Sequence, residues 1–106
     1  MTQRMNASLP EPLASHQGSI EGLCLKYHVT RLALFGSVSR GEAQADSDLD
    51  LLVSFAPGMT PGVGFFMLQE ELRDVLGQPV DLNTLEDLSR HFRDQVLREA
   101  RVVYEV

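Results

Sequence analysis

The sequence predicts an α/β domain in which a small sheet packs against helices. Short apolar runs bounded by glycine, proline or polar residues alternate with longer segments whose apolar residues recur at helical spacing. Hydrophobic residues make up 43% of the 106 positions and charged residues 23%, which is typical of a folded globular chain. This length allows one hydrophobic core, so we expect a single domain at residues 13–106 after a flexible lead-in at residues 1–12.

The first half of the domain is predicted to contain one helix and two strands. A helix is expected from residue 13 to residue 27, because its apolar residues share one face. These are Leu13, Ile20, Leu23, Cys24 and Tyr27. The apolar run from residue 31 to residue 37 predicts the first strand, and residues 37–42 a short helical turn. The segment "DLDLLVSF" at residues 48–55 predicts the second strand.

A loop and a second helix follow. Residues 56–64 contain two prolines and three glycines and are expected to form the loop. The Met and Phe residues near 59–67 are expected in the core, with the alternative that this loop flanks the base of a bound nucleotide. An amphipathic helix is predicted from Phe65 to Leu76, and Gly77 is expected to end it.

The end of the chain predicts a strand, a helix and a last strand. Residues 79–84 form the strand, and Thr84 is then expected to cap a helix together with Asp87 in a variant of the capping box. This helix is expected to carry an apolar stripe on one face, made of Leu85, Leu88, Phe92 and Val96. Residues 101–106 form the closing strand.

The net charge and the cysteine content argue against some classes of function and indicate the cellular compartment. The formal net charge of −6 argues against nucleic acid as a direct partner, because phosphate binding needs positive charge. The single cysteine, Cys24, excludes an internal disulfide and fits a reducing compartment. The first residues have no apolar leader pattern and no run reaches membrane-spanning length. We therefore expect a cytoplasmic protein without a membrane partner.

The stretch "GSVSRGEAQADSDLD" carries the strongest functional pattern. Gly36 allows a ligand to approach the backbone closely, and Ser37 offers a hydroxyl at the start of a helical turn that suits a phosphate. Asp48 and Asp50 are two residues apart on the predicted strand, so they project from the same face. Carboxylate oxygens are the ligands that Mg²⁺ prefers. The pattern therefore predicts metal-dependent nucleotidyl transfer.

Each part of this pattern also has a purely structural interpretation. Gly and Ser are common in turns, and an aspartate pair can lie on the solvated face of an edge strand. Strands disfavour Asp, however, so the alternating pair Asp48 and Asp50 needs a reason. The combination favours the nucleotide site.

The pattern resembles that of the polymerase beta-like nucleotidyltransferase superfamily. The shared elements are the Gly-Ser pair, a spacer, Asp-x-Asp and a third carboxylate, here Asp81 in "VDL". The segment "GSVSRGEAQADSDLDLLVSF" is most similar to the corresponding sequence of the minimal nucleotidyltransferases, including the MntA-type antitoxins of HEPN/MNT toxin–antitoxin pairs. The resemblance implies the polymerase beta-like fold, a small mixed sheet packed against helices.

The resemblance also implies a role for each site residue. Asp48, Asp50 and Asp81 would be catalytic and would hold two Mg²⁺ ions, with Asp81 near the attacking hydroxyl. Gly36 and Ser37 would position the phosphates of ATP. Arg40 is also expected at a phosphate, although a surface position on the short helical turn explains it equally well.

The resemblance implies an antitoxin that transfers AMP from ATP to a tyrosine hydroxyl of an HEPN toxin. Two alternatives remain: transfer to a small molecule, as in aminoglycoside nucleotidyltransferases, and an idle module that inhibits its partner by binding. Larger relatives carry a second domain over the acceptor side. We expect an open cleft here, completed by a partner in a homo- or hetero-oligomer.

Overall fold

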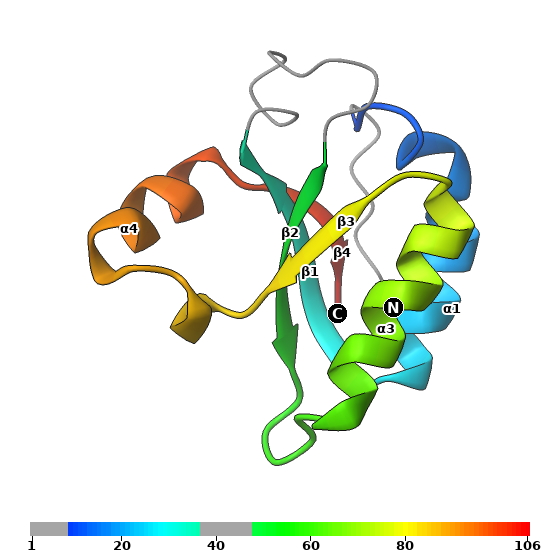
Figure 1. Cartoon of the computed structure of the whole chain (residues 1–106), viewed down its shortest axis with the longest axis horizontal. Helices are drawn as coiled ribbons and strands as arrows, with labels where there is room; N and C mark the ends of the chain where they lie inside the picture. Colours follow the sequence, from blue (N-terminus) through cyan, green and yellow to red (C-terminus); the bar gives the residue numbers. More distant parts are fainter. Residues whose placement is uncertain (1–8, 37–47) are drawn as a thin grey trace.

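The computed structural model describes residues 9–36 and 48–106, and its centre is a four-stranded sheet (Figure 1). The strand order across the sheet is β3-β2-β1-β4. The strands are β1 (Val29–Phe35), β2 (Leu49–Phe55), β3 (Val80–Asn83) and β4 (Arg101–Glu105). β1 pairs antiparallel with β2 and with β4, whereas β2 and β3 are parallel. The mixed sheet and its helices confirm the predicted fold class.

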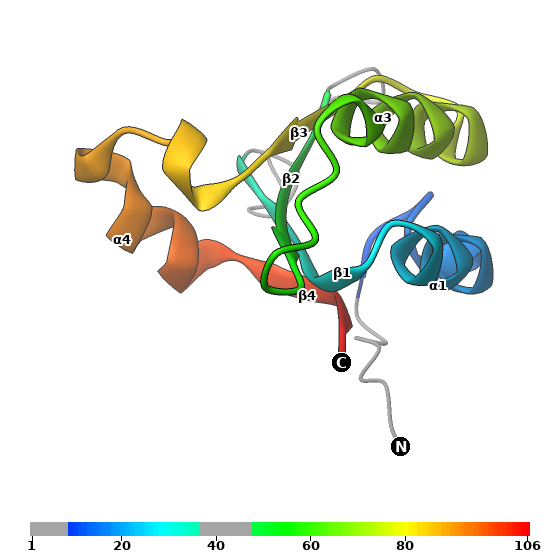
Figure 2. The same cartoon turned by 90° about the horizontal axis from the view of Figure 1, so that it is seen from below.

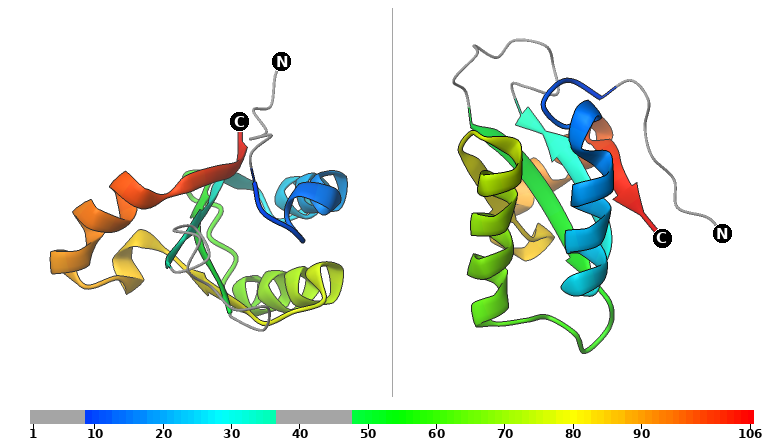
Figure 3. Two further views of the ribbon diagram at one scale, coloured as in Figure 1. Left: turned by 90° about the horizontal axis from the view of Figure 1, so that it is seen from above. Right: turned by 90° about the vertical axis from the view of Figure 1, so that its right-hand side faces the viewer.

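Two helices cover one face of the sheet (Figure 2). They are α1 (Gln17–Lys26), which follows a 3₁₀ turn at Ala14–His16, and α3 (Val63–Leu76). The right-hand view of Figure 3 shows α1 and α3 side by side across the strands. α3 ends at Gly77, whose φ of +70° is the left-handed conformation that glycine adopts without strain. The predicted end of this helix is therefore confirmed.

The core lies between these two helices and the sheet. Alternate residues of β2 point into it, because side chains of a strand project to opposite faces in turn. They are Leu49, Leu51 and Val53. Leu9 is also buried in the core, although it lies within the segment predicted as a lead-in.

Two further predictions concern Cys24 and membrane-spanning helices. Cys24 is buried as predicted, and burial, followed by the negative charge of Glu21, raises the pKa of its thiol to about 12. Within the described ranges, no helix is long and apolar enough to cross a bilayer.

The helix predicted from Thr84 is divided into two pieces. The capping box between Thr84 and Asp87 is present, but it closes only a 3₁₀ turn at Leu85–Asp87. Leu88 then adopts an extended conformation (φ −87°, ψ 143°), so the helix cannot continue through it. α4 (Arg90–Glu99) starts afresh, with Ser89 as its N-cap. α4 lies on the side of the sheet away from α1 and α3 (Figure 2).

The prediction that the Met and Phe residues near 59–67 belong to the core is wrong for most of them. Met59, Phe66 and Met67 are exposed, and only Phe65 packs against the core. The reason is geometric, because α3 contacts the core through a stripe of leucines at every fourth position. The stripe consists of Leu68, Leu72 and Leu76.

A polar contact joins α1 to α3 at the rim of the core. The Tyr27 hydroxyl donates a hydrogen bond to the carboxylate of Glu71. The Lys26 ammonium lies 3.1 Å from the same carboxylate and 5.2 Å from the centre of the Tyr27 ring. The hydrogen bond from Tyr27, and then that from Lys26, hold the pKa of Glu71 below its ordinary value of 4.5.

We predict that Glu71→Gln lowers the melting temperature at pH 7 and that the difference from wild type shrinks below pH 4.5. The folded protein lowers the pKa of Glu71, so the stabilisation is complete above the ordinary pKa and is lost as the pH falls through the folded one. Thermal unfolding between pH 3 and pH 8 measures this. Glu70→Gln is the matched control, since Glu70 lies on the surface of α3. An equal, pH-independent shift for both variants would contradict the prediction.

Candidate functional site

Asp50 lies at the centre of the candidate site. β1 places its last residue, next to Gly36, on one side of Asp50, and β3 places Asp81 on the other side. The Cα partner of Asp50 on β1 is Phe35, the last residue of that strand. Its Cα partner on β3 is Asp81. Paired residues of neighbouring strands project from the same face, so Asp50 and Asp81 carry adjacent carboxylates. This face is opposite to the one that α1 and α3 cover.

Gly36 is the residue that the backbone requires beside Asp50. Its φ is +79°, a conformation that other residues adopt only with strain. A Cβ atom at this position would lie 2.4 Å from Oδ2 of Asp50 and 3.2 Å from its Cγ. A side chain would therefore displace the carboxylate. The Gly36 bend therefore lies directly against the Asp50 carboxylate.

Asp81 is held in place from both edges of its short strand. On one edge β3 pairs with β2. On the other edge, Gln69 Oε1 of α3 accepts a hydrogen bond from the Leu82 N–H (2.9 Å), and Arg73 Nε donates to the Val80 carbonyl (3.2 Å). These two side chains form hydrogen bonds with backbone groups on the outer edge of β3, where a partner strand would otherwise bind. The register that puts Asp81 beside Asp50 is thus fixed by α3 as well as by β2.

Asp48 precedes β2 and is exposed, as is Asp81. Among the residues that the structure describes, no group of three or more His, Cys, Asp or Glu side chains is arranged to hold a metal ion. The three aspartates therefore occupy one end of the sheet without forming a ready-made metal cage. The three histidines take no part in such a group either.

The donor set nevertheless fits a magnesium–nucleotide complex. Mg²⁺ usually keeps several waters and is bound through one or two carboxylates together with the substrate phosphates. The adjacent carboxylates of Asp50 and Asp81 match that requirement. The space that a Cβ at Gly36 would fill lies directly against Asp50. Ser37 and Arg40, the other predicted phosphate contacts, lie outside the described residues.

A pocket of about 400 Å³ lies between the Gly36 bend and α4. Its lining residues are Phe35, Gly36, Leu88, Phe92, Gln95 and Val96. The sequence predicted Leu85, Leu88, Phe92 and Val96 on one face of a helix. Of these only Val96 is buried, and 58% of Phe92 is exposed. This pocket was not predicted from the sequence. The apolar stripe of the last predicted helix was the one sequence feature that could have indicated it.

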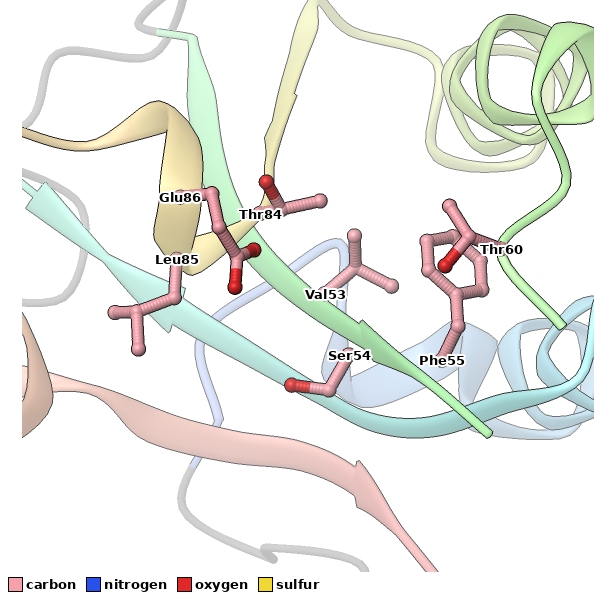
Figure 4. Close-up of a pocket in the computed structure, with 7 residues that line it drawn as sticks. All are labelled: Val53, Ser54, Phe55, Thr60, Thr84, Leu85 and Glu86. Carbon is pink, nitrogen blue, oxygen red and sulfur yellow. The ribbon is translucent and has the colours of Figure 1, made fainter. Parts of the chain in front are cut away.

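A second pocket, of about 380 Å³, lies farther along β2 (Figure 4). The polar residues Ser54, Thr60, Thr84 and Glu86 are part of its lining. Ser54 is four residues from Asp50 on the same strand, which is roughly 13 Å at the rise of a β-strand. A group bound here is therefore outside the immediate reach of the Asp50 carboxylate.

The mixed sheet, the paired aspartates and the glycine bend together define a nucleotidyltransferase. A family model described as "Polymerase beta, Nucleotidyltransferase" matches residues 19–106. The chain therefore belongs to the polymerase beta-type nucleotidyltransferase family. Within it, the chain is similar to protein adenylyltransferase MntA of Thermococcus cleftensis, with 41% identity over 81 residues that cover 74% of this chain and 77% of the relative.

Solved structures show the same likeness. A structure assigned as a minimal nucleotidyltransferase superposes with a TM-score of 0.74 at 41% identity, over 86% of this chain and 92% of the other. A toxin–antitoxin structure with AMP-PNP gives 0.68 at 25% identity, over 85% and 73% of the two chains. An MNT antitoxin in complex with tri-AMPylated HEPN toxin of Shewanella oneidensis shares the fold, with a TM-score of 0.63 at 22% identity over 89% and 73%. The predicted resemblance to minimal nucleotidyltransferases is confirmed.

We predict that Gly36→Ala lowers the free energy of unfolding by about 1–3 kcal/mol, because it adds backbone strain and crowds the Asp50 carboxylate. Urea denaturation measures the change. Gly22→Ala in α1 is the control: nothing lies within 4 Å of the added Cβ, so we expect a gain of about 0.5–1 kcal/mol. Adding Asp50→Ala to Gly36→Ala should recover the part of the loss that comes from crowding. No difference between the single and double variants would contradict the contact.

Proposed function

We propose that this chain is a protein adenylyltransferase that transfers AMP from ATP to a tyrosine hydroxyl of an HEPN toxin and so acts as its antitoxin. The observation that carries the proposal is the pairing of Asp50 with Asp81 beside Gly36. The identity to protein adenylyltransferase MntA and the fold shared with an MNT antitoxin bound to its toxin support it. We also propose that the reaction takes place in the cytoplasm, where the buried Cys24 stays reduced.

Each residue of the candidate site has a proposed role in binding ATP or Mg²⁺. Asp48, Asp50 and Asp81 would bind the Mg²⁺ that accompanies ATP, and the open space at Gly36 would admit its phosphates close to the backbone. Ser37 and Arg40 would bind the phosphate oxygens. The chemistry that Mg²⁺ supplies when bound is neutralisation of the triphosphate charge and activation of the attacking hydroxyl.

Asp81 would act as the base toward the acceptor. The tyrosine oxygen forms a bond to the α-phosphorus, the bond to the bridging oxygen breaks, and pyrophosphate leaves with the electron pair. The hydroxyl proton passes to the Asp81 carboxylate, which is exposed and can therefore meet an acceptor from outside the chain. An exposed base suits a protein substrate, because the partner protein itself would cover the acceptor side of the site.

An idle module that inhibits by binding is the second candidate. Such a module would share the fold of the MNT antitoxin that is bound to its toxin and would need neither metal nor ATP. The two candidates differ in whether metal binds and in whether AMP is transferred. Both properties are measurable.

We predict that Mg²⁺ or Mn²⁺ with ATP raises the melting temperature of the wild type, because a ligand that binds only the folded state stabilises it. The gain should disappear in the double variant Asp48→Ala, Asp50→Ala. Differential scanning fluorimetry with and without EDTA measures it. The control variant is Asp74→Asn, an exposed carboxylate on α3, which should retain the full gain. An undiminished gain in the double alanine variant would rule out the aspartates as the metal site.

We predict that Asp50→Asn and Asp81→Asn each slow AMP transfer by about 100-fold or more, since a metal ligand or a base is lost. The wild type and variants are incubated with ATP, Mg²⁺ and an HEPN toxin, the proposed partner. Intact-mass spectrometry counts the AMP units added to that protein, and the acceptor residue is located by peptide mapping.

The same experiment separates the two candidates. Asp74→Asn should transfer AMP at the wild-type rate. Tight binding of the HEPN protein without any added mass would favour the idle module. AMP found on a residue other than tyrosine would contradict the proposed acceptor but not the enzyme.

A further inference from the structure

We infer that the pocket shown in Figure 4 binds an arginine side chain of the acceptor protein and thereby positions the acceptor hydroxyl at Asp81. The inference rests on the proposed function and adds a recognition contact to it. Glu86, on the 3₁₀ turn that follows β3, is the residue that would bind the guanidinium group.

The pocket lies on the same face of the sheet as the aspartates. Ser54 of β2 lines it and is four residues from Asp50, so both side chains project from one face. Thr84 lines it from the end of β3, three residues after Asp81, which is roughly 10 Å along an extended chain. β2 and β3 are parallel, so both strands run from the aspartates toward the pocket. A protein that presents a hydroxyl to Asp81 can therefore reach the pocket with a second side chain.

The pocket is also on the acceptor side of the site. Gly36 lies against Asp50 from the β1 side, where the phosphates are expected, whereas Asp81 lies on the β3 side of Asp50. Residues 84–86 of the pocket continue directly from β3. The pocket therefore borders the side from which the acceptor would approach.

Glu86 carries a negative charge that no described residue neutralises. Its side chain is exposed, and Figure 4 shows its carboxylate pointing toward β2 among the lining residues. Two basic side chains of this region are engaged elsewhere. Arg93 donates to the backbone carbonyls of Leu88 and Glu86, and Arg31 Nε lies 3.6 Å from Glu105 Oε2 on β4. The net charge of −6 also favours a basic partner surface.

The remaining lining suits the rest of an arginine side chain. Ser54 and Thr60 carry hydroxyl groups that can accept hydrogen bonds, and a guanidinium has five N–H donors in a planar fork. Phe55 contributes an aromatic ring, on which guanidinium groups stack. Val53 and Leu85 provide apolar surface for the methylene groups. The combination favours arginine over lysine, because an ammonium group has three donors and no planar face.

Other classes of ligand match the pocket less well. Glu86 would repel a phosphate or a nucleotide. A divalent metal ion takes several oxygen ligands, and no group of three or more His, Cys, Asp or Glu side chains in residues 9–36 and 48–106 is arranged for one. A guanidinium needs one carboxylate together with neutral acceptors, and the pocket contains both.

The test measures AMP transfer to an HEPN toxin and binding of that toxin. The variants are Glu86→Gln, which removes the charge and keeps the shape, and Glu86→Arg, which reverses the charge. Asp94→Asn is the matched control, because Asp94 is an exposed carboxylate of α4 outside the pocket. Titration with Mg²⁺ and AMP-PNP shows whether the ATP site is intact, and thermal unfolding shows whether each variant is folded.

We expect Glu86→Gln to raise the KM for the toxin about five- to tenfold and to change kcat by less than about twofold, because the lost hydrogen bond contributes to binding and not to the chemical step. The difference from wild type should shrink at high salt, which screens the ion pair. Asp94→Asn should retain the wild-type KM, and all three variants should bind AMP-PNP as the wild type does.

A charge exchange identifies the partner residue. Each arginine and each lysine of the toxin is replaced by glutamate in turn, and the variants are tested with Glu86→Arg. One arginine variant should restore a large part of the lost affinity, about tenfold. Rescue by a lysine variant alone would overturn the assignment of arginine.

The outcomes separate this inference from the proposed function. Wild type that neither binds nor modifies the toxin would overturn both. Transfer with an unchanged KM in Glu86→Gln would overturn only the arginine pocket. If the toxin is bound but not modified, the Kd replaces the KM, and an unchanged Kd in Glu86→Gln overturns the pocket in the same way. An equal effect of Asp94→Asn would also overturn it, because the effect would then come from the net charge.

Discussion

The contact between the Asp50 carboxylate and Gly36 is the constraint on which the candidate site depends. It requires a left-handed glycine at the end of β1 and an aspartate near the start of β2, in a register that sets them side by side. The parallel pairing of β2 with β3 then adds Asp81 on the other side of Asp50. A slip of one residue in either pairing would turn carboxylates toward the core. The site is therefore specified by strand register.

The core supports this arrangement by placing α1 and α3 on one face of the sheet. Because one face of β2 is filled with leucine and valine, its other face is free to carry Asp50. α3 has a second role, since its Gln69 and Arg73 side chains bind the outer edge of β3. The helix that completes the core thus also fixes the strand that carries Asp81. Packing and site geometry are coupled through this one helix.

Much of the fold was predictable from local pattern, but the pairings between strands were not. Alternation in "DLDLLVSF" identified β2 and the face that carries Asp50, and Gly77 marked the end of α3. Asp81 could be selected only through a family resemblance, because its register depends on contacts with distant residues. The division of the last helical segment at Leu88 was also missed, since a capping box followed by an apolar stripe predicts a continuous helix.

The interruption of the helical segment at Leu88 determines which side chains of α4 are buried. A helix that continued from Thr84 with its stripe against the sheet would bury Phe92, which would stabilise the fold by about 1.5–3 kcal/mol. Instead the extended Leu88 redirects the chain, and α4 buries only Val96 among its own residues. Exposed aromatic surface that lines a pocket is more typical of binding sites than of optimised packing. α4 therefore leaves the Phe92 ring exposed at the pocket instead of buried in the fold.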